Sequence, residues 1–174
     1  MEVEHTDYQE TIDDALRIVY SHHHRLVTRL FPEAERPLDI QQLRAGPLGR
    51  DLAILAALAR GELREPKEHV IERTETVLQL LFWPPMAEDY TVPRSFWETP
   101  LGRMLSMAKY RAHQPSELVS IGHAAQRLGV TRPTVYRWMD ERRLGYVRDE
   151  MSGRTFVVQR DVESMLQDQN AFSD

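Results

Sequence analysis

The stretch IGHAAQRLGVTRPTVYRWMD, residues 121–140, decides the fold of this chain. Two helices that meet at a sharp angle need apolar facing sides, a small residue where the backbones approach, and a turn residue that tolerates a positive φ. Ala125 supplies the close approach and Gly129 the turn, while Ser120 and Thr131 stand where each helix needs an N-cap. The inward-facing positions are Ala124, Leu128, Val130, Val135 and Trp138. This spacing predicts a helix-turn-helix.

The residues after this stretch predict a β-hairpin, or wing. Two runs of strand-forming residues, 146–148 and 155–158, are joined through Met151-Ser152-Gly153. Leu118 and Val119 offer a further strand at the edge of the hairpin. A last helix is expected to start near Arg160-Asp161 and to close the core with Val162, Met165 and Leu166.

Residues 118–166 resemble the winged helix-turn-helix of the MerR/excisionase-like family. The resemblance rests on IGHAAQRLGVTRPTVYRWMDERRL, on the glycine-anchored wing and on QRDVESML. It implies that the second helix enters the major groove of double-stranded DNA and that the wing lies on the flanking backbone. The groove-facing set implied by position is Thr131, Arg132, Thr134, Tyr136 and Arg137, and the wing contacts are Arg148 and Arg154.

The charge distribution favours one local contact surface over a polycationic protein. The chain has a net charge of −5, yet eight arginines and five acidic residues between Glu117 and Arg160 make that segment +3. Taken alone, these arginines fit an ordinary solvated helix face, and the helix dipole is enough to explain Arg142 and Arg143. The helix-turn-helix spacing and the attached wing favour DNA binding instead.

The first two thirds of the chain read as helices. Apolar periodicity and the Pro and Gly positions place them at 11–31, 39–44, 47–61 and 66–82, with another starting at Pro100. His113-Gln114-Pro115-Ser116 is the expected domain boundary. The predicted fold is therefore mainly α: a helical bundle at 1–113, and a small winged helix-turn-helix domain with a β-hairpin wing at 114–174.

The first helix carries a candidate oligomerisation seam with spacings of four and three residues. The seam consists of Ile12, Leu16, Val19, His23, Leu26 and Leu30. A single winged module offers few base contacts, so specific binding generally needs two copies on paired half-sites. We therefore expect residues 1–113 to form a homodimer, most simply a twofold one.

Several classes of function lack support in the sequence. The chain has no cysteine, and it contains no HExxH, GxSxG, Walker or dinucleotide-binding motif, so no enzyme activity and no cofactor are expected. The side chains of His22, His23 and His24 would point about 100° apart on a helix, which argues against a shared metal ion. No apolar run approaches eighteen residues, which predicts a cytoplasmic protein without a membrane span.

The sequence thus predicts a sequence-specific DNA-binding protein, with transcriptional regulation as the leading function. The helix at 131–143 would enter the major groove and the wing at 146–158 would contact the flanking backbone. One alternative is an excisionase-like architectural factor, or a DNA-binding antitoxin or adaptor whose helical domain binds a protein partner. A second alternative is an interaction module whose winged fold binds protein rather than DNA.

Overall fold

A computed structural model describes residues 7–30, 39–84 and 86–171 of the chain. The elements of the first part are α1 (Gln9–Leu30), α2 (Ile40–Ala45), α3 (Pro47–Arg60), α4 (Lys67–Phe82), the 3-10 helix η2 (Arg94–Glu98) and α5 (Pro100–Ala112). Those of the second part are η3 (Pro115–Glu117), β1 (Leu118–Ser120), α6 (Ile121–Leu128), α7 (Arg132–Asp140), β2 (Tyr146–Asp149), β3 (Arg154–Val158) and α8 (Gln159–Ala171). The mainly helical fold is confirmed, whereas the expected end of the first helix at Phe31-Pro32 lies outside the described residues.

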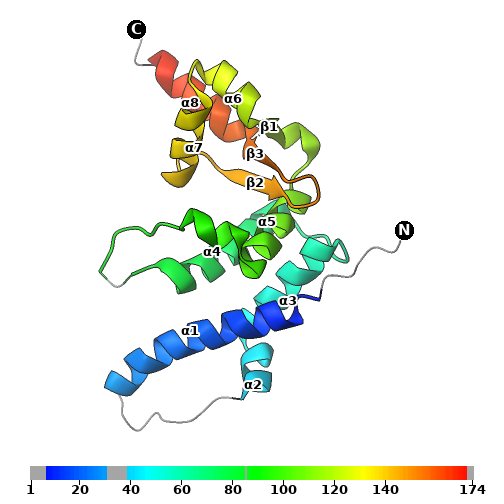
Figure 1. Cartoon of the computed structure of the whole chain (residues 1–174), viewed down its shortest axis with the longest axis vertical. Coiled ribbons are helices and arrows are strands. Elements are labelled where there is room, and N and C mark those ends of the chain that lie inside the picture. Colours follow the sequence, from blue (N-terminus) through cyan, green and yellow to red (C-terminus); the bar gives the residue numbers. More distant parts are fainter. Residues whose placement is uncertain (1–6, 31–38, 85, 172–174) are drawn as a thin grey trace.

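The N-terminal helices pack around α5. Met104, Leu105 and Ala108 of this helix have no exposed surface, and they meet Leu52 and Leu55 of α3 in the first hydrophobic core. α5 starts where the sequence predicted, because Thr99 caps it by accepting a hydrogen bond from the Gly102 N–H at 3.1 Å, with Pro100 in its first turn. α5 lies in the middle tier of the molecule, between α1 and the C-terminal elements (Figure 1).

The predicted seam on α1 divides into two parts. Ile12, Leu16 and Val19 are buried within the chain, and the neighbouring carboxylate of Asp13 is bound at two points by Arg44 of α2. The other three seam residues, His23, Leu26 and Leu30, are exposed. The buried half of the seam is therefore occupied by the chain's own core, and only the second half faces outward.

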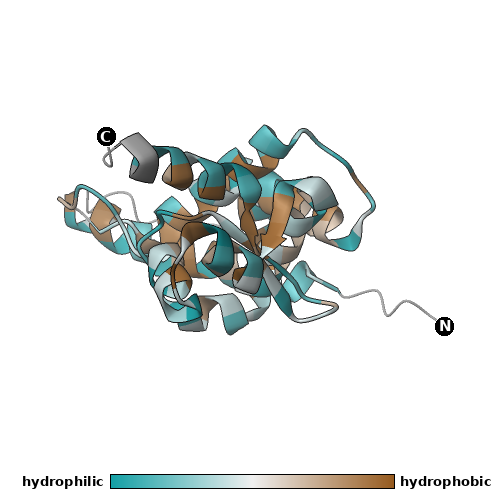
Figure 2. Ribbon diagram, turned by 90° about the horizontal axis from the view of Figure 1, so that it is seen from above, coloured by the Kyte–Doolittle hydropathy of each residue, from teal (hydrophilic) through white to brown (hydrophobic). Residues whose placement is uncertain are grey.

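The C-terminal elements form a second hydrophobic core, which shares no buried residue with the first. The sheet has the order β1-β3-β2, with Val119 opposite Val157 and Val147 opposite Phe156. Its edge strand β1 and the hairpin are those that the sequence predicted. Figure 2 shows the hydrophobic residues gathered between the elements and the hydrophilic ones largely outside.

The second face of the wing sheet is covered by α5, which the sequence did not predict. Phe156 of β3 stacks on Tyr110 of α5, with ring centroids 6.1 Å apart, and Val147 of β2 is only 1% exposed. Tyr146 meets the Trp97 ring edge-on at 5.8 Å. The hairpin therefore forms part of the contact between the two parts of the chain, which are stacked along the long axis (Figure 1).

None of the helices in the described ranges is both long and apolar enough to cross a membrane.

Candidate nucleic-acid interface

The turn between α6 and α7 has the geometry that the sequence predicted. Gly129 has φ +66°, and its N–H donates to the carbonyl of Gln126 at 3.3 Å. The Ser120 hydroxyl accepts from the N–H of His123 at 3.2 Å, which confirms the first cap. Thr131 occupies the N-cap position of α7, but its hydroxyl pairs with the Thr134 hydroxyl instead of a backbone N–H. The expected side-chain cap at Thr131 is therefore wrong.

Gly129→Ala tests this turn. A Cβ at Gly129 would meet no atom within 4 Å, so the substitution should cost only the strain of an L-residue at positive φ, about 1 kcal/mol in free energy of unfolding. Gly129→Asn should cost less, because Asn tolerates this region. Urea unfolding monitored by circular dichroism measures both, and equal stability of Gly129→Ala and the parent would contradict the assignment.

α7 presents one buried face and one exposed face. Val135, Trp138 and Met139 are buried in the second core and fix the orientation of the helix. On the opposite side Thr131, Arg132, Tyr136 and Arg137 are exposed and Thr134 is partly so. Every predicted groove-facing residue thus retains solvent contact, and four of the five are well exposed.

The two arginines of the exposed face are available for a partner. Arg137 lies 3.7 Å from Glu141, but both side chains are largely exposed and such a pair is weak and screened by salt. The guanidinium of Arg132 rests beside Gly122 of α6, and no described residue forms a hydrogen bond or ion pair with it.

The two predicted wing contacts differ in environment. Arg154, at the start of β3, is exposed, and its guanidinium has no hydrogen bond or ion pair within the described ranges. Arg148 instead donates to Glu98 at 2.7 Å, and its side chain is only 29% exposed. This ion pair lowers the pKa of Glu98. Arg154 is therefore free to meet a phosphate, whereas Arg148 is engaged by the N-terminal part.

Arg94 of η2 is a further cation beside α7 that the sequence analysis missed. It binds both carboxylate oxygens of Asp140, at 2.8 and 2.6 Å, and its guanidinium carbon lies 5.7 Å from the centre of the Tyr136 ring. The residue comes from a Pro-containing segment distant in sequence, so neither periodicity nor motif spacing connects it to α7.

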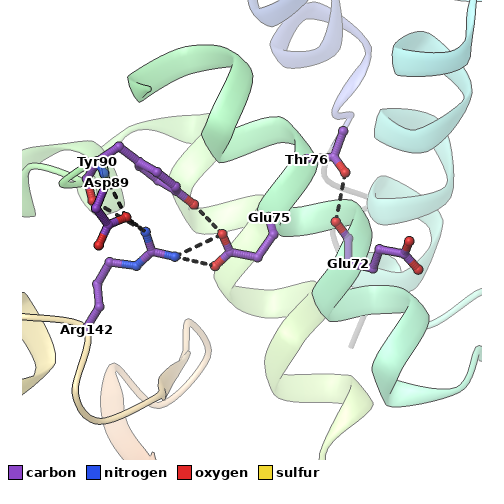
Figure 3. A network of polar contacts seen from close by, with 6 residues as sticks. All are labelled: Glu72, Glu75, Thr76, Asp89, Tyr90 and Arg142. Atoms are coloured by element: carbon purple, nitrogen blue, oxygen red, sulfur yellow. Dashed lines mark hydrogen bonds and ion pairs between the residues drawn. The ribbon is translucent and has the colours of Figure 1, made fainter. Parts of the chain in front are cut away.

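The end of α7 is anchored through Arg142 (Figure 3). Its guanidinium donates to both carboxylate oxygens of Glu75, at 2.9 and 3.0 Å, and to Asp89 at 3.2 Å, and it lies 4.1 Å from the centre of the Tyr90 ring. The Tyr90 hydroxyl also binds Glu75, and burial raises the pKa of this tyrosine well above its usual range. Arg142 therefore anchors the C-terminal part of the chain to α4 and the loop that follows it, and is more than the helix-dipole partner inferred from sequence.

The backbone at this anchor is unusual. Arg142 has φ +58°, a region that L-residues with side chains rarely adopt, and it follows directly on the last turn of α7. The strain is offset by the contacts that its side chain makes. The orientation of α7 is thus fixed along its buried face by the second core, and just beyond its C-terminal end by α4 and the loop that follows it.

The chemistry available on α7 and the wing is that of exposed arginines. Within the described residues no group of three His, Asp or Glu side chains could hold a metal ion. The exposed cations Arg132, Arg137 and Arg154 lie on α7 and the wing, and Arg is suited to bidentate contact with guanine or phosphate.

Comparison with known proteins agrees with this geometry. Searches of the curated proteins and of the solved structures returned no match to this chain. A family model described as a helix-turn-helix domain matches residues 118–170, which comprise β1, α6, α7, the wing and nearly all of α8. The C-terminal third of the chain is thus a DNA-binding helix-turn-helix domain.

Proposed function

We propose that this protein is a sequence-specific transcriptional regulator that inserts α7 into the major groove. The observation that carries the proposal is the two-sided character of α7: Val135 and Trp138 hold it in the core, while Arg132, Tyr136 and Arg137 stand exposed. Selection of duplexes from a random pool by the full-length protein tests it, because a sequence-specific regulator must enrich a common site.

The arginines of the interface are given different roles in this proposal. Arg137 lies more than one helical turn beyond the start of α7 and is assigned to a base edge, and Arg154 on the wing is assigned to a phosphate. Arg148 would reach a phosphate only after leaving Glu98. Its role in DNA binding remains a prediction.

Arg137→Ala and Arg154→Ala should weaken DNA binding in distinguishable ways. The first should cost about 1–2 kcal/mol on the selected site and relax the preference at one base pair. The second should weaken binding to all sequences similarly and lower the salt slope by about one unit. Fluorescence anisotropy on selected and scrambled duplexes measures both, with Arg64→Ala, at an exposed arginine in the loop between α3 and α4, as a matched control. Identical profiles for the two variants would contradict the assignment.

We further propose that two chains associate through the outer half of α1, residues 23–30. Leu26 and Leu30 are 46% and 73% exposed, and Val27 beside them is 41% exposed. Three large apolar side chains along one end of a helix favour a protein partner. A second copy of the chain is the occupant that would also supply a second recognition helix.

A further inference from the structure

A cavity of about 500 Å³ lies between the two parts of the chain. α4 and α5 line it from the N-terminal side, and the residues that open β2 and α8 line it from the C-terminal side. The chain has only two lysines, Lys67 and Lys109, and both line this cavity. Apolar walls are provided by Ile71 and Val158.

Lys109 is a charged group without a charged partner. Its ammonium nitrogen lies 5.9 Å from the centre of the Trp97 ring and 5.8 Å from that of Tyr146, and no described residue forms a hydrogen bond or ion pair with it. Burial among these atoms lowers the pKa of Lys109, although the side chain keeps partial contact with solvent. A desolvated ammonium without a counter-ion is unfavourable.

The acidic residues around the cavity are already engaged. The carboxylate of Glu75 is held by Arg142, and that of Glu117 forms an ion pair with Lys67. Asp161 accepts the Gly145 N–H at 2.7 Å. Glu163 is likewise bonded to Gln159, at 2.8 Å. Glu75 and Asp161 raise the pKa of Lys109 from a distance, against the larger effect of burial.

Lys67 is satisfied by Glu117, but two other cations of the cavity form no hydrogen bond or ion pair with a described residue. In addition to Lys109, the exposed Arg160 at the rim forms no hydrogen bond or ion pair with any described residue. His113 does not compensate for them, because its Nδ1 bonds with the Lys109 carbonyl at 2.7 Å and burial lowers its pKa. The site thus contains hydrogen-bond donors without acceptors, and an anion is the kind of ligand that would satisfy them.

We propose that this cavity binds a small organic monocarboxylate. Its carboxylate group would pair with Lys109, and its apolar body would pack against Ile71 and Val158. A single charge fits best, because the surrounding carboxylates of Glu75, Glu117, Asp161 and Glu163 would repel a dianion such as a phosphate monoester. The ligand would touch both parts of the chain, and the proposal does not depend on DNA binding.

Lysine side-chain NMR of the full-length protein tests the proposal directly. With lysine labelled at Cε, two side-chain signals are expected, and Lys67→Arg assigns them. Phenylacetate and hexanoate should shift the Lys109 signal saturably, with a dissociation constant of about 1 mM, and move the ion-paired Lys67 far less. Phenylacetamide, the neutral counterpart, should shift neither. If neither carboxylate moves Lys109 saturably, or if phenylacetamide does so equally, the proposal is overturned.

A pair of matched variants provides a second readout. Lys109→Met keeps most of the length of the side chain and removes an unpaired charge, so the variant should remain folded. It should abolish the increase in melting temperature that phenylacetate gives to the parent. Lys67→Arg, which changes the other lysine but keeps a positive charge beside Glu117, should retain most of that increase. An unchanged response of Lys109→Met would overturn the assignment of the anion to Lys109.

Discussion

Leu26→Asp is expected to weaken binding of the protein to a duplex with two half-sites by about a hundredfold. Joining two modules raises the local concentration of the second to about millimolar, and loss of the dimer removes this gain. Leu26 is 46% exposed within one chain, so the charge should leave the monomer fold intact. Light scattering measures the association state, and anisotropy measures the affinity for one and two half-sites.

Two controls separate this prediction from a loss of folding. Leu63→Asp introduces the same charge at another exposed leucine and should change neither association nor affinity. Leu16→Asp should unfold the bundle, because Leu16 is 2% exposed within the chain's own core. The prediction would be contradicted if the parent protein were monomeric and still bound its selected site with the affinity expected of a dimer.

Arg142→Ala is expected to lower the free energy of unfolding by about 2–3 kcal/mol. The change removes the ion pairs to Glu75 and Asp89 and the cation–π contact with Tyr90, and it leaves the positive φ of residue 142 in place. The ion pairs contribute the smaller share, since both partners keep a third or more of their surface in solvent.

Arg142→Gly is the matched comparison for this anchor. Glycine loses the same side-chain contacts but relieves the strain at positive φ, so it should be about 1 kcal/mol more stable than the alanine variant. Thermal and urea unfolding of both variants give the difference. Two variants that are equally stable, or an alanine variant as stable as the parent, would show that Arg142 does not anchor the two parts of the chain as described.

Local signals explain why the helix-turn-helix could be predicted. A glycine at the turn, a serine cap and the apolar spacing around Ala124 and Val135 all act within twenty residues, and the structure confirms them. The paired strands were likewise recognisable, because two short strand-forming runs flank Ser152-Gly153. The boundaries of α3 follow from Pro47 and Gly61 for the same reason.

Long-range polar contacts could not be predicted in this way. The pairs Arg142 with Glu75, Arg94 with Asp140 and Arg148 with Glu98 join residues far apart in the sequence. An arginine in an exposed position shows no periodicity that would reveal a distant carboxylate. The sequence therefore indicated a wing with two free arginines, whereas in the structure Arg148 joins the wing to the N-terminal part.

The seam on α1 illustrates a different ambiguity. Spacings of four and three residues indicate that one helix face is buried, but they do not specify whether the partner is the same chain or another. Ile12 and Leu16 pack inside the bundle, whereas Leu26 and Leu30 remain exposed. A dimer through the outer half of α1 remains a prediction.

The salt dependence of duplex binding tests the central claim most directly. Affinity of the full-length protein for its selected duplex should fall steeply as salt rises, with a slope of about 0.9 in log–log terms for each phosphate contacted. The double variant Arg132→Ala, Arg137→Ala, which leaves the buried face of α7 unchanged, should lose the preference for the selected site over a scrambled one. Absence of duplex binding at low salt, or an unaltered preference in the double variant, would contradict the placement of α7 in the major groove.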